Sequence, residues 1–268
     1  AQGLAVDPRR RNLVALADLC LDADLAMMHD AQDVIPGVQE LVDAHRMGTP
    51  TLEEIRSLTF DGGSRGYRLL LGLRHHRDWT AIRVRAFEAA LASIRRCHRI
   101  VVADVDDDLE GESDTGSTDV EDRNLMARTV VSQADLVLAV GLPSLTGLHH
   151  LVRTYGRLLA AGLDAERLVP VINRSPRNSR ARSSVTSTFA QLIGTERLAQ
   201  NPIHIGDKRG VEEALLDGVP LPAGLAESVT RPTDALLESV GPRSPITATE
   251  PVAVQPGSLG HWADEEAG

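Results

Sequence analysis

Several residue types and patterns are scarce in this sequence, and each scarcity excludes a class of protein. The chain has only two cysteines, Cys20 and Cys97, in 268 residues, which is too few for a disulfide framework. No apolar run approaches the roughly 18 residues that a membrane-spanning helix requires. Gly-x-Gly-x-x-Gly and Cys-x-x-Cys are both missing, so the sequence offers neither a dinucleotide fingerprint nor a clustered zinc motif. We therefore expect a reduced, cytoplasmic chain with no transmembrane segment.

Aromatic residues and lysine are also rare. With two Trp, two Tyr and three Phe, the core has to be built from Leu, Val, Ile and Ala. A hydrophobic content of 42 % makes such a core feasible. Lys208 is the only lysine, so no other lysine is available to bind phosphate or to act in catalysis. The net charge of −10 argues against nonspecific nucleic-acid binding by the whole chain, and no specific nucleic-acid partner is evident.

Short apolar runs alternate with stretches of helical spacing. The runs are nearly continuous, which predicts strands covered on both faces, over Leu13–Leu19, Arg68–Leu73, Ile100–Val105, Leu136–Gly141, Leu168–Asn173 and Ile203–Gly206. The spacing between them predicts helices over Val38–Arg46, Ala81–Arg96, Asp119–Ser132, Thr146–Leu159, Ser183–Ile193 and Val211–Leu216. This alternation predicts an α/β fold with a mostly parallel sheet and helices on both faces.

The composition changes near Gly241. Residues 241–268 contain four prolines among Ser, Thr, Ala and acidic residues, which predicts a disordered tail. Residues 1–240 are accordingly expected to form the folded domain.

Two of the predicted strands end in aspartate. Asp18 follows the first strand and Asp104 follows Ile100–Ala103. Because ligands bind at the carboxyl ends of strands in such sheets, the two carboxylates are expected to converge if their strands are neighbours. Asp104 would suit a Mg²⁺ ion beside a nucleotide phosphate, and Asp18 would suit the positioning or activation of a water. The alternative is a helix cap or a solvated acidic loop, since Asp106, Asp107 and Asp108 follow directly.

A third strand ends in Asn173 and Arg174. The amide of Asn173 carries one acceptor oxygen and two donor hydrogens, which suits contact with a purine edge. An asparagine that starts a turn is the alternative interpretation of the same position.

Together these segments resemble the MinD/ParA group of deviant P-loop ATPases, most closely its actinobacterial CpaE/TadZ-like members. "LVALADLCLDADLAMMHD" (13–30) is similar to the family's second conserved segment, and "IVVADVDDDLEG" (100–111) to its Walker B strand. "ADLVLAVGLPSLTGLHHLV" (134–152) resembles the strand and helix that follow, "LVPVINR" (168–174) the adenine-side strand, and "VEEALLDGVPLP" (211–222) the terminal helix. The resemblance covers residues 1 to about 240.

The resemblance implies roles for individual residues. Asp104 would be the Mg²⁺-linked Walker B carboxylate, Asp18 a catalytic or water-positioning residue, and Asn173 an adenine contact. Arg174, and His204 in place of the family's usual proline, complete the nucleotide-binding residues. ATP and Mg²⁺ are the implied cofactors. The implied protein is a homodimer that changes partners on ATP hydrolysis, and the partner is often a polar or membrane-associated protein assembly. Its implied location is the cytoplasm, or the inner face of the membrane as a peripheral protein.

The resemblance also predicts a piece that these 268 residues do not contain. Family members begin with a strand and a Gly-rich loop that carries two lysines, whereas residues 1–11 resemble the end of the helix after that loop. Lys208 lies in "GDKRG", without Gly-x4-Gly-Lys-Ser/Thr spacing. We expect the first strand and the Walker A loop to be missing from the chain, and with them the backbone N–H groups that hold phosphate.

Two functions therefore remain open at the level of sequence. The first is a MinD/ParA-like ATPase that acts in the spatial positioning or assembly of a pilus, secretion or division apparatus. The second is a non-catalytic scaffold that kept the fold and lost the nucleotide chemistry.

Overall fold

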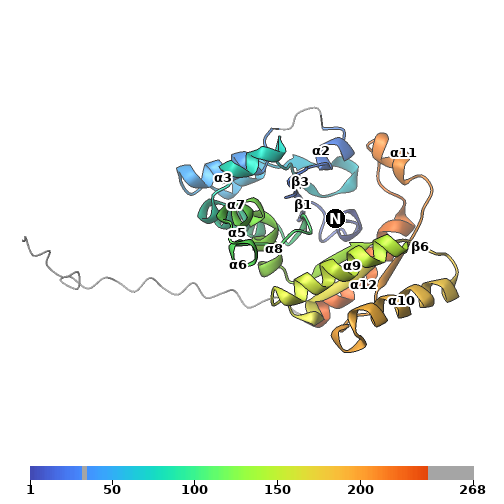
Figure 1. Ribbon diagram of the computed structural model, residues 1–268. Helices are drawn as coiled ribbons and strands as arrows, with labels where there is room; N and C mark the ends of the chain where they lie inside the picture. Colours follow the sequence, from blue (N-terminus) through green and yellow to red (C-terminus); the bar gives the residue numbers. More distant parts are fainter. Residues whose placement is uncertain (32–34, 241–268) are drawn as a thin grey trace, which may run out of the picture.

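A computed structural model describes residues 1–31 and 35–240, which form two sheets with helices around them (Figure 1). The first sheet has the order β2-β3-β1-β4 and the second the order β5-β6-β7. Every pairing is parallel except that of β2 with β3. The strands are β1 (Val14–Asp18), β2 (Phe60–Asp61), β3 (Arg68–Leu70), β4 (Ile100–Asp104), β5 (Val137–Gly141), β6 (Leu168–Ser175) and β7 (Ile203–Gly206).

The helices fall between the strands, as the alternating pattern predicts. They are α1 (Gln2–Ala5), α2 (Leu25–Met28), α3 (Val38–Met47), α4 (Leu52–Ser57), α5 (Val84–Cys97), α6 (Glu112–Thr115), α7 (Thr118–Arg123), α8 (Leu125–Gln133), α9 (Leu145–Ala160), α10 (Ser179–Ile193), α11 (Val211–Leu216) and α12 (Ala223–Val240). Short 3₁₀ turns lie at Gly63–Arg65, His76–Ala81, Ala165–Arg167 and Thr195–Arg197. The predicted mostly parallel α/β fold is confirmed.

Two helix predictions were incomplete. The expected helix over Asp119–Ser132 is divided into α7 and α8 at Asn124, whose side-chain amide donates to the carbonyl of Glu110 at 2.9 Å. Helix α12 was not predicted, because Pro232 lies inside it and proline ordinarily marks the end of a helical pattern. The expected tail, residues 241–268, lies outside the described residues.

Each sheet is covered on both faces. In the first sheet, apolar residues of β1 and β3 pack with α3 and α5 on one side, while Leu4 and Ala5 of α1 pack with Val14 on the other. In the second sheet, Tyr155 of α9 and Phe189 of α10 meet edge to face, with ring centroids 5.7 Å apart. The opposite face of that sheet packs against α12 through Leu236. The prediction of helices on both faces is therefore confirmed for both sheets.

Helices in both outer layers join the two sheets into one body. On one side, adjacent residues of α8 serve different cores, because Val130 packs against the first sheet's core and Val131 lies in that of the second. On the other side α1 contacts α12, and Arg10 pairs with Asp234 at 2.7 Å. Val105, directly after β4, packs against both cores. The two sheets thus share their helical layers, although no ladder joins β4 to β5 in the described residues.

Candidate functional site

The structure brings Asp18 and Asp104 together. They are direct partners in the parallel register of β1 and β4, each at the carboxyl end of its strand. The backbone N–H of Leu19 donates to the carbonyl of Asp104 at 2.8 Å, which continues the ladder beyond the last pair. Neighbouring strands lie about 4.8 Å apart, so the two carboxylates leave the sheet side by side, as the sequence predicts.

Asp18 is held by the loop that follows it. Its side chain is buried, with 1 % of the residue exposed. One carboxylate oxygen accepts from the N–H of Leu25 at 2.9 Å, and the other accepts from the N–H of Cys20 at 3.4 Å. Burial raises the pKa of Asp18, and the nearby charges of Asp104 and Asp24 raise it further against those two hydrogen bonds. Asp18 therefore fixes the start of α2 and also adds a carboxylate to the site.

Asp104 is the more accessible carboxylate of the pair. It is exposed, yet partial desolvation of its carboxylate raises its pKa, with a further contribution from the charge of Asp106. Cys20 lies beside both aspartates, and burial together with the charges of Asp104 and Asp106 raises the pKa of its thiol. Cys20 is accordingly a neutral thiol in this site and not a thiolate nucleophile.

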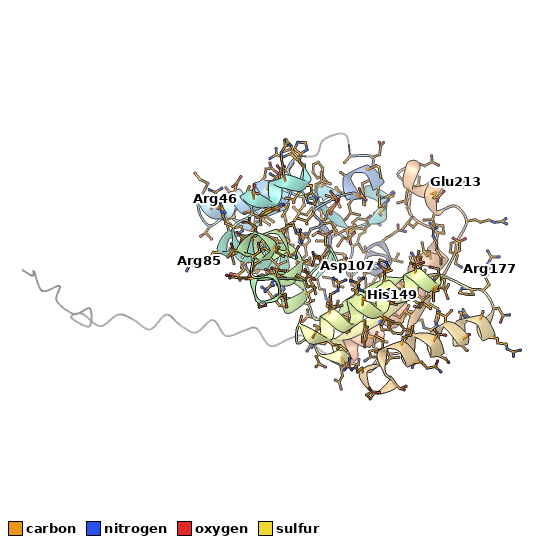
Figure 2. The ribbon with its side chains drawn as sticks, in the orientation of Figure 1. Arg46, Arg85, Asp107, His149, Arg177 and Glu213 are labelled. Carbon is orange, nitrogen blue, oxygen red and sulfur yellow. The ribbon has the colours of Figure 1, made fainter. Side chains whose placement is uncertain are left out.

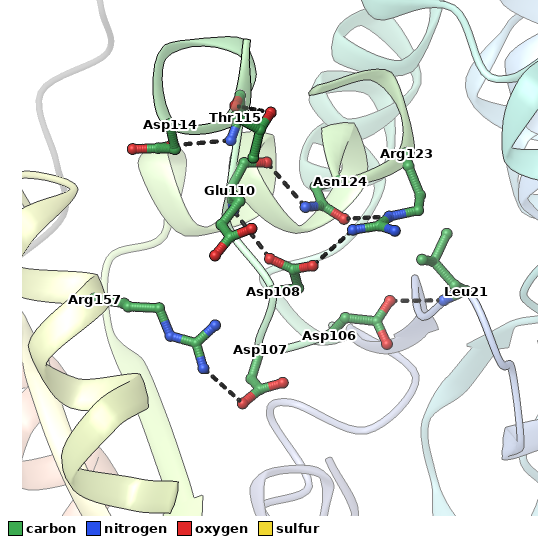
Figure 3. A network of polar contacts seen from close by, with 11 residues as sticks. Leu21, Asp106, Asp107, Asp108, Glu110, Asp114, Thr115, Arg123, Asn124 and Arg157 are labelled. Carbon is green, nitrogen blue, oxygen red and sulfur yellow. Dashed lines mark hydrogen bonds and ion pairs between the residues drawn. The ribbon is translucent and has the colours of Figure 1, made fainter. Parts of the chain in front are cut away.

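The acidic loop after β4 does not converge on a metal site. Figure 3 shows its carboxylates turned toward different partners. Asp106 accepts from the N–H of Leu21 at 2.8 Å, and Asp108 pairs with Arg123 at 2.8 Å. Over residues 1–31 and 35–240 no group of three or more His, Cys, Asp or Glu side chains could hold a metal ion. The loop residues are thus structural partners within the chain.

Asp107 joins the loop to the other half of the molecule. It accepts from the hydroxyl of Thr154 at 2.9 Å and lies 3.7 Å from Arg157, both on α9. Figure 2 places Asp107 between the two halves of the ribbon. Within residues 1–31 and 35–240, the buried Nε of Arg157 has no hydrogen-bond partner. The sequence does not predict this contact, because it links positions almost 50 residues apart.

The residues present fit the metal side of a nucleotide site. Mg²⁺ is usually bound by one or two carboxylates, with waters and substrate phosphates filling the other positions. Asp104 offers an exposed carboxylate of this kind, and a cation there would offset the like charges of Asp18 and Asp106. A polar cavity of about 200 Å³ lies close by, lined by residues 21–24 and 73–76 of the loops after β1 and β3.

For the phosphate groups of a nucleotide, the described residues do not offer an equally suitable set of ligands. Lys208 is exposed in the turn before α11, and no Gly-x4-Gly-Lys-Ser/Thr sequence occurs in the 268 residues. The described residues therefore lack the sequence that forms a backbone N–H cradle for the β- and γ-phosphates.

Asn173 and Arg174 lie near the carboxyl end of β6, in the second sheet. Both are exposed, and the side-chain oxygen of Asn173 accepts from the N–H of Arg174 at 2.9 Å. The pairing of β6 with β7 shifts register between Ile172 and Ser175, and Arg174 adopts a φ of +50° inside this irregularity. A positive φ is unfavourable for a residue with a Cβ, so the backbone is strained where the base contact is predicted.

His204 is engaged within the chain. Its Nδ1 lies 2.7 Å from the hydroxyl of Ser175 and its Nε2 lies 2.8 Å from the hydroxyl of Thr186. Burial lowers the pKa of His204, and the charge of Arg182 lowers it further. Both ring nitrogens of this neutral imidazole thus already have partners, so only the ring face remains for a base. Its role in nucleotide binding stays a prediction.

Arg65 is a residue near the site that the sequence did not indicate. It is buried at 5 % exposure, and its guanidinium donates to the carbonyls of Met28 at 3.3 Å, Val219 at 3.3 Å and Ala214 at 3.4 Å. It therefore ties α2, which begins at the segment fixed by Asp18, to α11 and the turn after it. Backbone carbonyls leave no mark in sequence, so no motif could have revealed this contact.

This arrangement is the fold of the MinD/ParA ATPases. The septum site-determining protein MinD from Pyrococcus horikoshii OT3, complexed with Mg-ADP, matches with a TM-score of 0.61 and 15 % identity over 90 % of each chain. A ParA family ATPase from Chlorobium tepidum TLS gives 0.59 and 16 % identity over 89 % of this chain and 88 % of that one. A complex of a Cyanothece McdA variant with ATP gives 0.57 and 14 % identity over 91 % and 90 %.

No protein-family model and no curated protein sequence matches the chain. At these identities the structural likeness shows the fold alone, so the residue roles have to be argued from the site itself. Among the helices of residues 1–31 and 35–240, none is long and apolar enough to cross a membrane.

Proposed function

We propose that this chain forms the body of a MinD/ParA-like ATPase that binds and hydrolyses ATP with Mg²⁺. The observation that carries the proposal is the in-register pair of Asp18 and Asp104 at the carboxyl ends of adjacent parallel strands. Ligands of doubly wound sheets bind at this edge. Two of the structures with this fold are described as complexes with Mg-ADP and with ATP, which supports the same class of ligand here.

Each residue would have a distinct task. Asp104, exposed at the strand end, would hold Mg²⁺ directly or through water, and the metal would neutralise phosphate charge. Asp18 would orient a water from its fixed position, because backbone N–H groups already set its carboxylate. Asn173 would read the adenine edge with its amide hydrogens, since its side-chain oxygen already accepts from the N–H of Arg174, and Arg174 would lie beside the base. The phosphate cradle would come from a Gly-rich, lysine-containing loop outside residues 1–268.

The test is ATP turnover with and without such a loop. Residues 1–268 alone should bind ATP weakly and release little phosphate, since the loss of one preorganised donor to a transition-state oxyanion already costs roughly 2.7–4 kcal/mol. The same chain preceded by a strand and a Gly-x4-Gly-Lys-Thr loop should turn over orders of magnitude faster. Asp104→Ala should abolish that activity and its Mg²⁺ dependence, whereas Glu88→Gln, an exposed change on α5, should not. Equal turnover with and without the loop would refute the nucleotide hypothesis.

The proposal extends to the oligomeric state, the location and the cellular assembly that the protein serves. By resemblance to CpaE/TadZ-like proteins, we infer a cytoplasmic homodimer that positions or assembles a pilus, secretion or division apparatus, with peripheral contact at the inner face of the membrane. The MinC:MinD cell division complex from Aquifex aeolicus is a structure of the same fold, which supports a protein partner. An ATP-dependent rise in mass on light scattering would support the homodimer, and an unchanged monomer with ATP bound would oppose it.

The second candidate is a non-catalytic scaffold. The observation that favours it is Asp18, whose two carboxylate oxygens are both engaged by backbone N–H groups, as a purely structural cap would be. A scaffold would keep its partner when ATP is added, and Asp104→Ala would leave partner binding unchanged.

A further inference from the structure

A group of exposed basic side chains lies at the carboxyl edge of the second sheet and at the start of α10. Residues 174–195 contain four arginines and no aspartate or glutamate, although the chain as a whole carries a net charge of −10. The pairing of Ser175 with Gly206 brings the loop after β7 to the same edge. Figure 2 shows Arg177 at the periphery of the molecule. We call this group the arginine surface, and its exposed members are Arg174, Arg177, Arg180, Arg182, Lys208 and Arg209.

The charges of the arginine surface are not balanced by the described part of the chain. Within residues 1–31 and 35–240, none of its six side chains takes part in an ion pair. Arg180 and Arg182 also lie in the first turn of α10, which has no acidic residue and where the helix dipole disfavours positive charge. An anionic partner would therefore lower the electrostatic energy of this surface.

The chemistry of arginine indicates what kind of anion fits. A guanidinium group binds carboxylates with two parallel hydrogen bonds, and its plane stacks on aromatic rings. A segment that carries several carboxylates next to an aromatic ring would use both properties. The sequence contains such a segment in residues 262–266, Trp-Ala-Asp-Glu-Glu. It lies outside the described residues, and its net charge of −3 is opposite to that of the arginine surface.

The position of α12 places this segment within reach. A Cβ built on Gly224, in the first turn of α12, would lie 3.7 Å from the Nζ of Lys208, so α12 begins beside the arginine surface. Val240 follows 16 residues later, which at 1.5 Å per residue is about 24 Å away. The chain from residue 241 to residue 261 can span up to about 70 Å. Because the segment is joined to α12, its effective concentration at the surface is on the order of millimolar.

We propose that residues 262–266 dock on the arginine surface of the same molecule. The carboxylates of Asp264, Glu265 and Glu266 accept charge-assisted hydrogen bonds from the guanidinium groups at the start of α10. The ring of Trp262 stacks on one of these guanidinium planes. The docked segment is an internal competitor that covers the arginine surface against other anions. Neither nucleotide nor Mg²⁺ takes part, so the docking is independent of the proposed ATPase function.

Modification of arginine by phenylglyoxal tests this contact in the chain of 268 residues. The reagent is uncharged, so its concentration near the protein does not follow the net charge. The test variant neutralises the three carboxylates of the segment and is Asp264→Asn/Glu265→Gln/Glu266→Gln. The control variant removes the same charge at three exposed positions elsewhere and is Glu53→Gln/Glu88→Gln/Glu238→Gln.

Peptide mass spectrometry gives the modification rates of Arg177, Arg180 and Arg182, with Arg85, exposed on α5, as the internal reference. At low salt we expect the three rates to be at least about threefold slower in the parent chain and the control variant than in the test variant. Arg85 should react equally in all three proteins. At about 1 M salt, where the Debye length is only about 3 Å, the difference should disappear. Equal rates in the parent chain and the test variant at low salt would overturn the proposal.

Three other occupants give distinct results, and each of them would also overturn the proposal. Protection that increases with protein concentration, together with a higher mass on light scattering, would show docking between two copies of the chain. If the parent chain and the test variant react equally but short duplex DNA slows both, the surface binds nucleic acid. The same result with phosphatidylglycerol vesicles in place of DNA would assign the surface to an anionic membrane.

Discussion

Asp18 and Asp104 occupy equivalent positions on adjacent strands but are held in different ways. Asp18 is buried and bonded to two backbone N–H groups, while Asp104 is exposed. Both carboxyl pKa values are raised, so the folded state holds these protons more tightly than the unfolded state. Stability is therefore lost as pH rises above the ordinary aspartate value of about 3.9 through the raised values. The pair is thus under electrostatic stress at neutral pH.

Asp104→Asn should relieve part of this stress. At pH 7 we expect a Tm about 1–3 °C above that of the parent chain, a small change because Asp104 is exposed. The difference should shrink as the pH falls toward the ordinary aspartate pKa of about 3.9, because the raised pKa values let the folded state take up these protons first. Millimolar Mg²⁺ should raise the Tm of the parent chain but not that of the variant. Glu88→Gln, with the same charge change on the exposed side of α5, serves as the control, and a Tm gain equal to that of Asp104→Asn would contradict the prediction.

Arg65→Ala should destabilise the protein by about 2–4 kcal/mol, because three carbonyl acceptors lose a charged donor at once. Urea denaturation measures the change. Arg46→Ala removes an exposed pair with Asp43 at 2.8 Å and should cost no more than about 0.5 kcal/mol. Equal losses for the two variants would show that Arg65 is not a structural tie between α2 and α11.

At the scale of elements, the end of β6 combines strain with a hydrogen-bonded support. Arg174 has φ +50° beside the register shift, and His204 on β7 connects Ser175 with Thr186 of α10. Strained backbone persists where the surrounding structure holds it, and it is concentrated at functional sites.

Arg174→Gly should raise stability by up to about 1 kcal/mol, because glycine adopts a positive φ without a Cβ penalty. If Arg174 contacts nucleotide, ATP affinity should fall in the loop-carrying chain despite this gain. Arg177→Gly is the matched control, since Arg177 lies in the exposed loop before α10 (Figure 2) and has no positive φ. Thermal melting and titration with ATP measure both effects. A loss of stability in Arg174→Gly would exclude strain at this position.

His204→Gln should reduce the loss of unfolding free energy that occurs as the pH falls. The pKa of His204 is lowered in the folded state, so the unfolded state takes up the proton first as pH falls below about 6.5. Stability is therefore lost on acidification through that window, and a residue that does not titrate removes this contribution. Urea midpoints between pH 5 and pH 7.5 measure the slope. An acid limb of the stability profile that is as steep in His204→Gln as in the parent chain would contradict the assignment.

The whole molecule consists of two partial sheets held by common helical layers. Among residues 1–31 and 35–240, strands β4 and β5 each have one edge without a paired strand and carry partly exposed apolar side chains, a combination that favours strand-to-strand association. Stability of residues 1–268 should consequently be marginal and concentration-dependent.

Val140→Lys should reduce self-association of residues 1–268, because a charge on an exposed edge strand opposes further pairing. We expect a lower mean mass on light scattering and slower aggregation on heating. Met47→Lys changes an exposed position at the end of α3 and should have no such effect. Sharp, reversible two-state melting of a monomeric parent chain would count against this account.

The sequence alone determined the alternation of strands and helices and the aspartates at two strand ends. These features are local, since apolar runs, helical spacing and the residue after a run are set by neighbours along the chain. The same dependence on local sequence explains why the division between α7 and α8 and the presence of α12 were not predicted. Asn124 divides a helix through a bond to Glu110, and α12 continues through Pro232 because it packs against the second sheet.

Only the tertiary structure decided which strands are neighbours. The register that pairs Asp18 with Asp104 joins residues 86 positions apart, and the carbonyls that bind Arg65 come from α2, α11 and the turn after it. The engagement of both His204 nitrogens depends in the same way on β6 and α10. Such contacts use backbone groups and distant hydroxyls, which have no periodicity in sequence, so they exist only once packing has set the distances between elements.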